Sequence, residues 1–103
     1  MMIQINTDRT IEWHQRHNEH FKTLVSEELD RYGDHITRVE IHLSDENGPK
    51  EGINNIRCLM EVRLEGRQPI ATSDQADNIE LSVAGAIVKM QASLKTILER
   101  NHK

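Results

Sequence analysis

Hydrophobic residues recur along the N-terminal third of the chain with two periods, which predict a strand followed by a helix. Residues 3–7 alternate apolar and polar side chains, as in a short strand with one buried face. From residue 11 to residue 32 the apolar positions recur every three or four residues, which predicts an amphipathic helix. We expect Gly33 to end this helix in the left-handed conformation. The apolar helix positions are Trp13, Phe21, Leu24, Val25, Leu29 and Tyr32.

Three further strands are predicted in the middle of the chain. Residues 36–44 and 56–65 each alternate with a period of two, and the charged, glycine-containing stretch 45–52 should be the exposed loop between them. After a glycine turn, residues 67–72 should return as a short fourth strand. Pro69 cannot donate a ladder hydrogen bond, so we expect this strand at an edge of the sheet or at a bulge.

A second amphipathic helix is predicted from Asp77 or Asn78, either of which suits an N-cap, to about Arg100. Gly85 lies inside this helix, where glycine costs about 1 kcal/mol relative to alanine, so we expect it to allow close packing against the sheet or the first helix. The predicted order is β-α-β-β-β-α. Each helix has one apolar stripe and each strand one apolar face, which together predict an α+β fold with both helices on one face of a four-stranded sheet.

Composition supports a single domain over residues 1–103, because a chain of this length builds one core. Aromatic residues make up only 3% of the chain, so a platform on which bases stack is not expected. The one cysteine, Cys58, lies in an apolar strand segment and is interpreted as a buried structural thiol. The N-terminal residues predict neither a signal peptide nor a membrane span, and we expect a cytoplasmic protein.

Charge narrows the range of partners. The net charge of -4 argues against a protein that coats nucleic acid indiscriminately, because Lys and Arg supply most non-specific affinity. No DNA partner is expected. Residues 78–103 carry a net charge of +2, whereas residues 8–32 and 33–77 are net negative. On the residues alone, the simplest interpretation of the C-terminal basic side chains is that they keep the protein soluble.

Candidate catalytic and metal-binding groups are few. His14, His17 and His20 follow one another at steps of three residues, but two such steps spread the rings over about 120° of a helix. We therefore do not expect them to share a metal ion. The acidic turn that begins at Asp45 is not in the register of a calcium loop, and no phosphate-binding glycine loop or nucleophile elbow is recognisable. We expect neither an enzyme nor a bound cofactor.

Two stretches resemble a known family. Residues 31–44 (RYGDHITRVEIHLS) and 58–71 (CLMEVRLEGRQPIA) are similar to the bacterial ribosome-associated inhibitor and hibernation-promoting factor family. With the order and lengths of the elements, the resemblance covers nearly the whole chain, which would be a short form without the dimerisation domain of long members. It implies a stress or hibernation factor that blocks translation by occupying the channel for messenger and transfer RNA on the small ribosomal subunit.

The resemblance also implies which side chains contact ribosomal RNA. Basic residues on the two helices make these contacts in the family, and scattered cations can read phosphate positions. By position, the RNA-binding residues here would be Arg16, Lys22, Arg31, Lys89, Lys95 and Arg100. Family members usually carry basic residues at four positions that are acidic or neutral in this chain: Glu28, Ala92, Thr96 and Leu98. The alternative is therefore a protein-binding regulatory module of the same fold that has lost ribosome binding.

Overall fold

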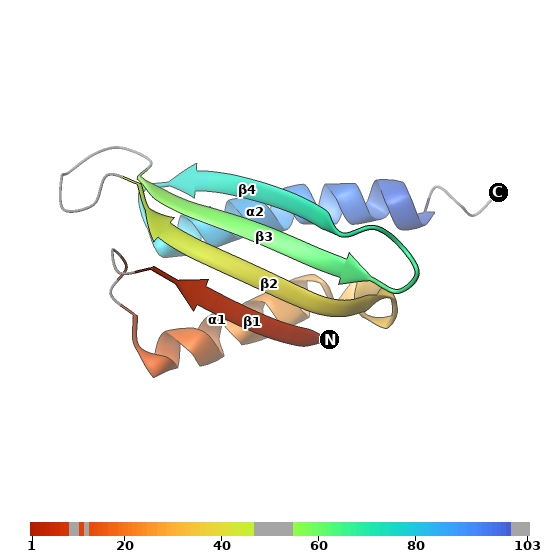
Figure 1. The fold of residues 1–103 in the computed structure, drawn as a ribbon, viewed down its shortest axis with the longest axis horizontal. Coiled ribbons are helices and arrows are strands. Elements are labelled where there is room, and N and C mark those ends of the chain that lie inside the picture. Colours follow the sequence, from red (N-terminus) through yellow and green to blue (C-terminus); the bar gives the residue numbers. More distant parts are fainter. Residues whose placement is uncertain (9–10, 12, 47–54, 100–103) are drawn as a thin grey trace.

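A four-stranded sheet forms one layer of the molecule and two helices form the other (Figure 1). The computed structural model describes residues 1–8, 11, 13–46 and 55–99. Both helices lie on the same face of the sheet, as predicted, and the α+β fold with the order β-α-β-β-β-α is confirmed. The elements are β1 (Met2–Thr7), α1 (Gln15–Glu28), the 3-10 helix η1 (Asp30–His35), β2 (Ile36–Asp45), β3 (Ile56–Leu64), β4 (Ile70–Ala76), α2 (Ile79–Leu94) and the π-helical turn η2 (Lys95–Glu99).

The strands follow one another across the sheet in chain order, β1-β2-β3-β4. β1 runs parallel to β2, so the connection between them must cross over the sheet, and α1 is that crossover. The other two pairings are antiparallel. Side chains alternate along each strand, so the register that pairs Ile5 with Ile41 and Ile41 with Met60 directs all three toward the helices.

The core lies between the two layers and is built almost entirely from aliphatic and methionine side chains. Each fully buried side chain of this size contributes about 1.5–3 kcal/mol relative to exposure. Cys58 is fully buried among them, as predicted, and burial is the main cause that raises the pKa of its thiol to about 12. The largest fully buried hydrophobic side chains in the described part of the chain are Val25, Leu29, Val39, Ile41, Cys58, Met60, Val62, Val83, Met90 and Leu94.

The first helix is shorter than predicted and ends differently. His14 is its N-cap, and the helix gives way after Glu28 to η1 rather than running to Tyr32. The predicted left-handed cap at Gly33 is wrong: among the described glycines only Gly66, in the turn between β3 and β4, has a positive φ, of 72°. The 3-10 turn tightens the chain, and the backbone N–H of Tyr32 donates to the carbonyl of Leu29, so both side chains stay buried.

The fourth strand lies later in the chain than predicted, at Ile70–Ala76 instead of 67–72. Asp74, which lies beyond the end of the predicted strand, is part of β4. The alternation of apolar and polar residues did not reveal this strand, because two of its residues that face α2, Thr72 and Asp74, are polar. Both have a hydrogen-bonding or ion-pair partner on α2. The Thr72 hydroxyl donates to the Ala86 carbonyl at 3.0 Å, and the Asp74 carboxylate pairs with Lys89 at 3.0 Å. β4 is an edge strand, as expected, although Pro69 precedes it.

The second helix begins as predicted at Asn78, whose side-chain oxygen accepts the N–H of Leu81 at 2.8 Å. Its described part ends at Glu99; Arg100 and the predicted loop residues 47–52 lie outside the described residues.

Together, α2 and η2 (Ile79–Glu99) are long and apolar enough to span a membrane by length and composition alone. The buried side chains of this helix belong to the domain core, and we interpret it as a core helix.

Close packing at Gly85 is confirmed. A Cβ atom built at this position would lie 3.1 Å from Cβ of Asp74 and would collide with the carboxyl group of the same residue. The missing side chain therefore lets α2 approach β4 closely, which was one of the two packings predicted from the sequence.

Candidate nucleic-acid interface

The two helices run in the same direction and are joined by polar side chains. Partners on α1 and η1 pair in chain order with partners on α2 and η2, as the parallel orientation requires. Glu28, where the resemblance implies a basic residue, is used within the domain, because Gln91 donates to both its carbonyl and its carboxylate. The bridges are His20–Glu80 at 3.1 Å, Glu28–Gln91 at 2.9 Å and Arg31–Glu99 at 2.6 Å.

Two of the predicted RNA-binding cations are already paired within the protein. Arg31 binds Glu99, which also accepts a hydrogen bond from the hydroxyl of Tyr32. Burial and this carboxylate raise the pKa of Tyr32. The ammonium group of Lys89 donates to the carbonyl of Ser73 at 2.7 Å and to Asp74 at 3.0 Å. Both cations remain partly exposed, so a phosphate group would compete with an existing partner at each site.

Three other predicted cations, Arg16, Lys22 and Lys95, make no hydrogen bond or ion pair with the described part of the chain. Arg16 and Lys95 are exposed, whereas Lys22 is half-buried. They do not form a cluster. Lys22 lines a hollow beside β1, at the opposite edge of the sheet from β4, where Lys89 is bound. Arg100 is outside the described residues.

Carboxylates interrupt the positive charge on the helical layer. Glu19, Glu27 and Asp30 are exposed between the cations of α1 and η1. Over the described residues the helices therefore present alternating charges, with no continuous positive strip. Such a surface suits binding at a few separate phosphate positions better than electrostatic attraction along a nucleic-acid strand.

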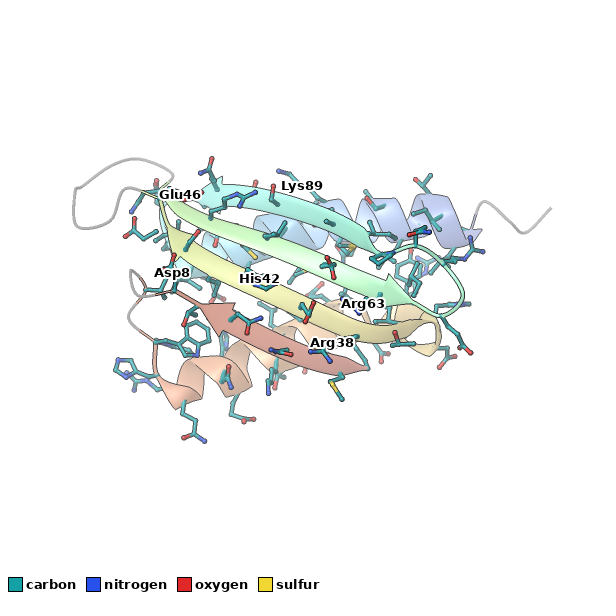
Figure 2. All side chains as sticks on the ribbon, viewed as in Figure 1. Asp8, Arg38, His42, Glu46, Arg63 and Lys89 are labelled. Carbon is teal, nitrogen blue, oxygen red and sulfur yellow. The ribbon has the colours of Figure 1, made fainter. Side chains whose placement is uncertain are left out.

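The open face of the sheet carries basic residues that the sequence interpretation did not select. Arg38, Arg57 and Arg63 point away from the helices, because the strand alternation that buries their neighbours directs them outward. Figure 2 shows Arg38 and Arg63 on this face. That alternation was the signal that could have identified them. Glu40 lies 3.2 Å from Arg38 and 3.9 Å from Arg63, and Glu61 lies 3.4 Å from Arg63. Paired acids therefore neutralise most of this charge.

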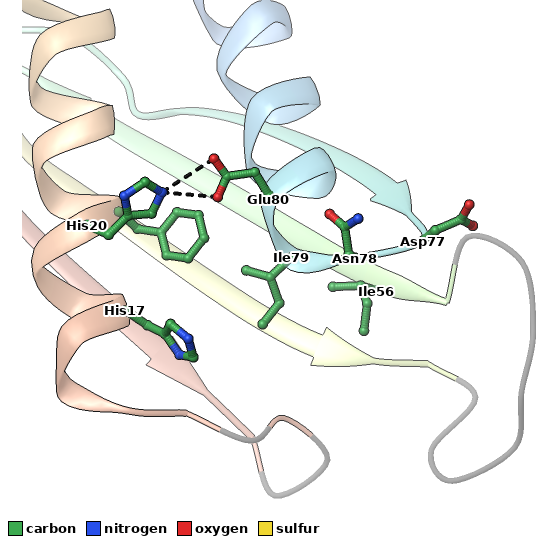
Figure 3. A pocket seen from close by; sticks show the side chains of 8 residues that line it. His17, His20, Ile56, Asp77, Asn78, Ile79 and Glu80 are labelled. Atoms are coloured by element: carbon green, nitrogen blue, oxygen red, sulfur yellow. Dashed lines mark hydrogen bonds and ion pairs between the residues drawn. The ribbon is translucent and has the colours of Figure 1, made fainter.

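The three N-terminal histidines do not meet at one point. The backbone N–H of His14 donates to Nδ1 of His17 at 3.2 Å, whereas His20 turns toward α2 and pairs with Glu80 (Figure 3). Among the described residues, no three His, Cys, Asp or Glu side chains are placed to hold a metal ion. A cleft of about 460 Å³ lies between the beginnings of the helices, where Phe21, Ile56 and Ile79 supply the apolar lining.

The sequence of residues 5–102 matches the family described as Sigma 54 modulation protein / S30EA ribosomal protein. The chain belongs to this family. This S30EA-family protein also resembles two solved structures. The crystal structure of the Thermus thermophilus Protein Y N-terminal domain matches with a TM-score of 0.73 and 18% identity, over 92% of this chain and 97% of that one. A ribosomal subunit interface protein from Coxiella burnetii matches with a TM-score of 0.67 and 19% identity, over 93% and 96%.

Among curated proteins, no sequence matches this S30EA-family protein significantly. The family is one of ribosome-associated modulation factors and is not known as a family of enzymes. The predicted family is thus confirmed, and so is the general assignment to ribosome-associated modulation. The individual RNA-contacting residues and the mode of action stay predictions.

Proposed function

We propose that this S30EA-family protein binds the small ribosomal subunit in the cytoplasm, contacts ribosomal RNA and blocks translation by occupying a site, with no bond made or broken. The observation that carries the proposal is the family match over residues 5–102. It is supported by the fold, which is similar to that of a ribosomal subunit interface protein from Coxiella burnetii. Charge supports a small set of contacts rather than general nucleic-acid affinity, because the chain is net negative.

Arg16, Lys22 and Lys95 are the first candidates for phosphate contacts. None of them would have to leave a partner within the described structure before it binds a phosphate group. Lys89 and Arg31 would have to share or exchange their carboxylates, Asp74 and Glu99, so each should contribute less. Arg16, Lys22 and Lys95 should therefore contribute more to binding than Lys89 and Arg31, which have partners to give up.

Sedimentation through sucrose gradients tests ribosome binding. In lysate from stationary-phase cells at low salt, the protein should travel with small subunits or whole ribosomes. Recovery only at the top of the gradient under these conditions would contradict the proposal. Added salt should release the protein, because phosphate contacts displace counterions.

Charge reversal tests the residues. Lys95→Glu should weaken ribosome binding roughly tenfold and make the dependence of log K on log salt shallower by about one, as expected for a lost phosphate contact. The matched control is Arg67→Glu, which makes the same charge change at an exposed position in the turn between β3 and β4, outside both helices. Equal weakening by both variants would show that net charge matters and that Lys95 is not a contact.

The second candidate is a protein-binding regulatory module of the same fold. Two observations favour it: carboxylates interrupt the cations of the helical layer, and Glu28 is held by Gln91 within the domain. Capture from extract treated with ribonuclease separates the two functions. A protein partner should remain bound after treatment, whereas partners held through ribosomal RNA should be lost.

A further inference from the structure

The outer face of α2, on the side opposite the sheet, carries no charge from Leu81 to Ala92. Leu81 and Val88 are 53% and 64% exposed there, and apart from Met1 and Met2 they are the only large hydrophobic residues exposed in the described structure. Ala84 and Ala92 occupy the intervening turns and are also exposed. We call these four residues the α2 strip. Their spacing of three or four residues places them on one side of the helix.

This face departs from the usual design of a surface helix. A helix that covers a core normally turns an apolar stripe inward and a polar face to water, and α1 follows this rule. In α2, apolar residues occupy both the buried and the exposed sides. Thr96, one turn beyond Ala92, adds little polarity because its hydroxyl donates back to the Ala92 carbonyl at 3.1 Å. The strip offers no side-chain donor for a phosphate group and suits an apolar protein surface.

The two ends of the strip carry opposite charges, Glu80 at the first and Lys95 at the second, so the strip is complementary to a reversed copy of itself. Glu80 lies eight residues before Val88, and Lys95 lies seven residues after it. At 100° per residue, Lys95 lies about 20° and Glu80 about 80° from the direction of Val88, and both lie on the same side of it. Lys95 therefore closes the strip at its C-terminal end, and Glu80 lies beside its N-terminal end. That side faces α1, because Glu80 binds His20. Lys95 has no partner within the described residues.

We propose that the α2 strip binds a second copy of this chain, with the two α2 helices antiparallel and Val88 close to the two-fold axis. The two-fold axis runs across the helices between the two copies. It reverses the direction of α2 but leaves the edge that faces α1 on the same side of the dimer. Glu80 of each copy therefore faces Lys95 of the other. Two such pairs form for each dimer. Ala84 of one copy meets Ala92 of the other, and these small side chains let the helices approach closely.

The size of the strip sets the strength of the dimer. From Leu81 to Thr96 the helix rises about 22 Å, and a face about 10 Å wide gives a footprint of roughly 220 Å² per copy. A stable complex buries about 800 Å² per partner. The dimer is therefore weak and forms only at high protein concentration. If Lys95 contacts ribosomal RNA as proposed above, the dimer and the ribosome compete for it; the dimer itself does not depend on that function.

Sedimentation equilibrium of the full chain, from about 10 μM to about 1 mM, tests self-association in this affinity range. The mass should rise toward that of a dimer with concentration, more strongly at low salt. Val88→Glu should weaken the dimer at least tenfold, because it places two carboxylates at the axis. Ala71→Glu makes the same kind of change on the open face of the sheet and should leave the dimer intact. A monomer at every concentration, or a dimer that survives Val88→Glu, overturns the proposal.

Disulfide trapping tests the orientation. Val88→Cys should cross-link to itself under mild oxidation much faster than the exposed control Ala71→Cys, and native Cys58 should not interfere, because it is fully buried. A mixture of Ala84→Cys and Ala92→Cys chains should form mixed dimers in preference to either self-linked dimer. Preferential self-linking at Ala84→Cys would instead indicate parallel helices and overturn the arrangement, as would equal rates for Val88→Cys and Ala71→Cys.

Discussion

Replacement of Gly85 by alanine should have two opposing effects on stability: alanine favours the helical conformation of α2, but its methyl group has no room beside β4. The added methyl group would collide with the carboxyl group of Asp74, and it would also lie 3.1 Å from Cβ of that residue. Rotation of the Asp74 side chain can relieve the first contact, but the second is fixed by the distance between α2 and β4. Asp74 would also have to leave Lys89, its partner at 3.0 Å.

The competing terms have different sizes. Alanine should stabilise the helix by about 1 kcal/mol relative to glycine. The pair between Asp74 and Lys89 is partly exposed, with side-chain exposures of 25% and 54%, so its loss costs at most about 1 kcal/mol. Forcing an extra methyl group into a packed contact costs about 1–3 kcal/mol. We expect Gly85→Ala to lower the free energy of unfolding by about 1–2 kcal/mol, and Tm by roughly 5–10 °C in a domain of this size.

A double-mutant cycle measured by urea unfolding checks this reasoning. Asp74→Ala removes the carboxyl group that blocks the methyl group, so the double variant should be more stable than Gly85→Ala alone, with a coupling energy of about 1 kcal/mol or more. Ala84→Gly, at the exposed neighbouring position, measures helix propensity without the collision and should cost about 1 kcal/mol. A stabilised Gly85→Ala variant, or a coupling energy near zero, would refute the packing argument.

Three further outcomes are expected. Asn78→Ala should cost about 1 kcal/mol in urea unfolding, because it removes the acceptor for the Leu81 N–H; a change near zero would show that water replaces the cap. Leu29→Ala should cost about 2–5 kcal/mol, since the side chain is fully buried; a surface-like loss below about 0.5 kcal/mol would contradict its place in the core. The pKa of Cys58 is raised from 9.0 to about 12 on folding, so the unfolded chain loses this proton first. The free energy of unfolding should therefore fall from about pH 9 upward, by at most about 1.4 kcal/mol per pH unit from this group. Cys58→Ala should show a shallower fall, and identical pH profiles would argue against the shift.

Local periodicity determined most of the fold. A period of two places Val39 and Ile41 on one face of a strand whatever lies across from them, and spacings of three and four residues define the buried side of α2 in the same way. Two helices and four strands with one apolar face each leave few ways to bury all of them. The helix start was likewise predicted to within one residue, with Asn78 as one of two candidate caps, because a cap depends on a hydrogen bond within four residues.

Features that depend on distant partners were decided only by the tertiary structure. Asp74 looked like part of a connection, yet it belongs to β4 because Lys89 on α2 neutralises it. Gly33 looked like a helix cap, yet the buried side chains of Leu29 and Tyr32 draw the chain into a 3-10 turn.

The same distinction applies to the candidate interface. The sequence supplied the cations, but their partners lie up to 68 residues away along the chain, as for Arg31 and Glu99. Only the packed structure separates Lys95, which is exposed and without a partner in the described chain, from Lys89, which is already bound. Periodicity determines which side of an element is buried, whereas the neighbours of each charge depend on how the elements pack together.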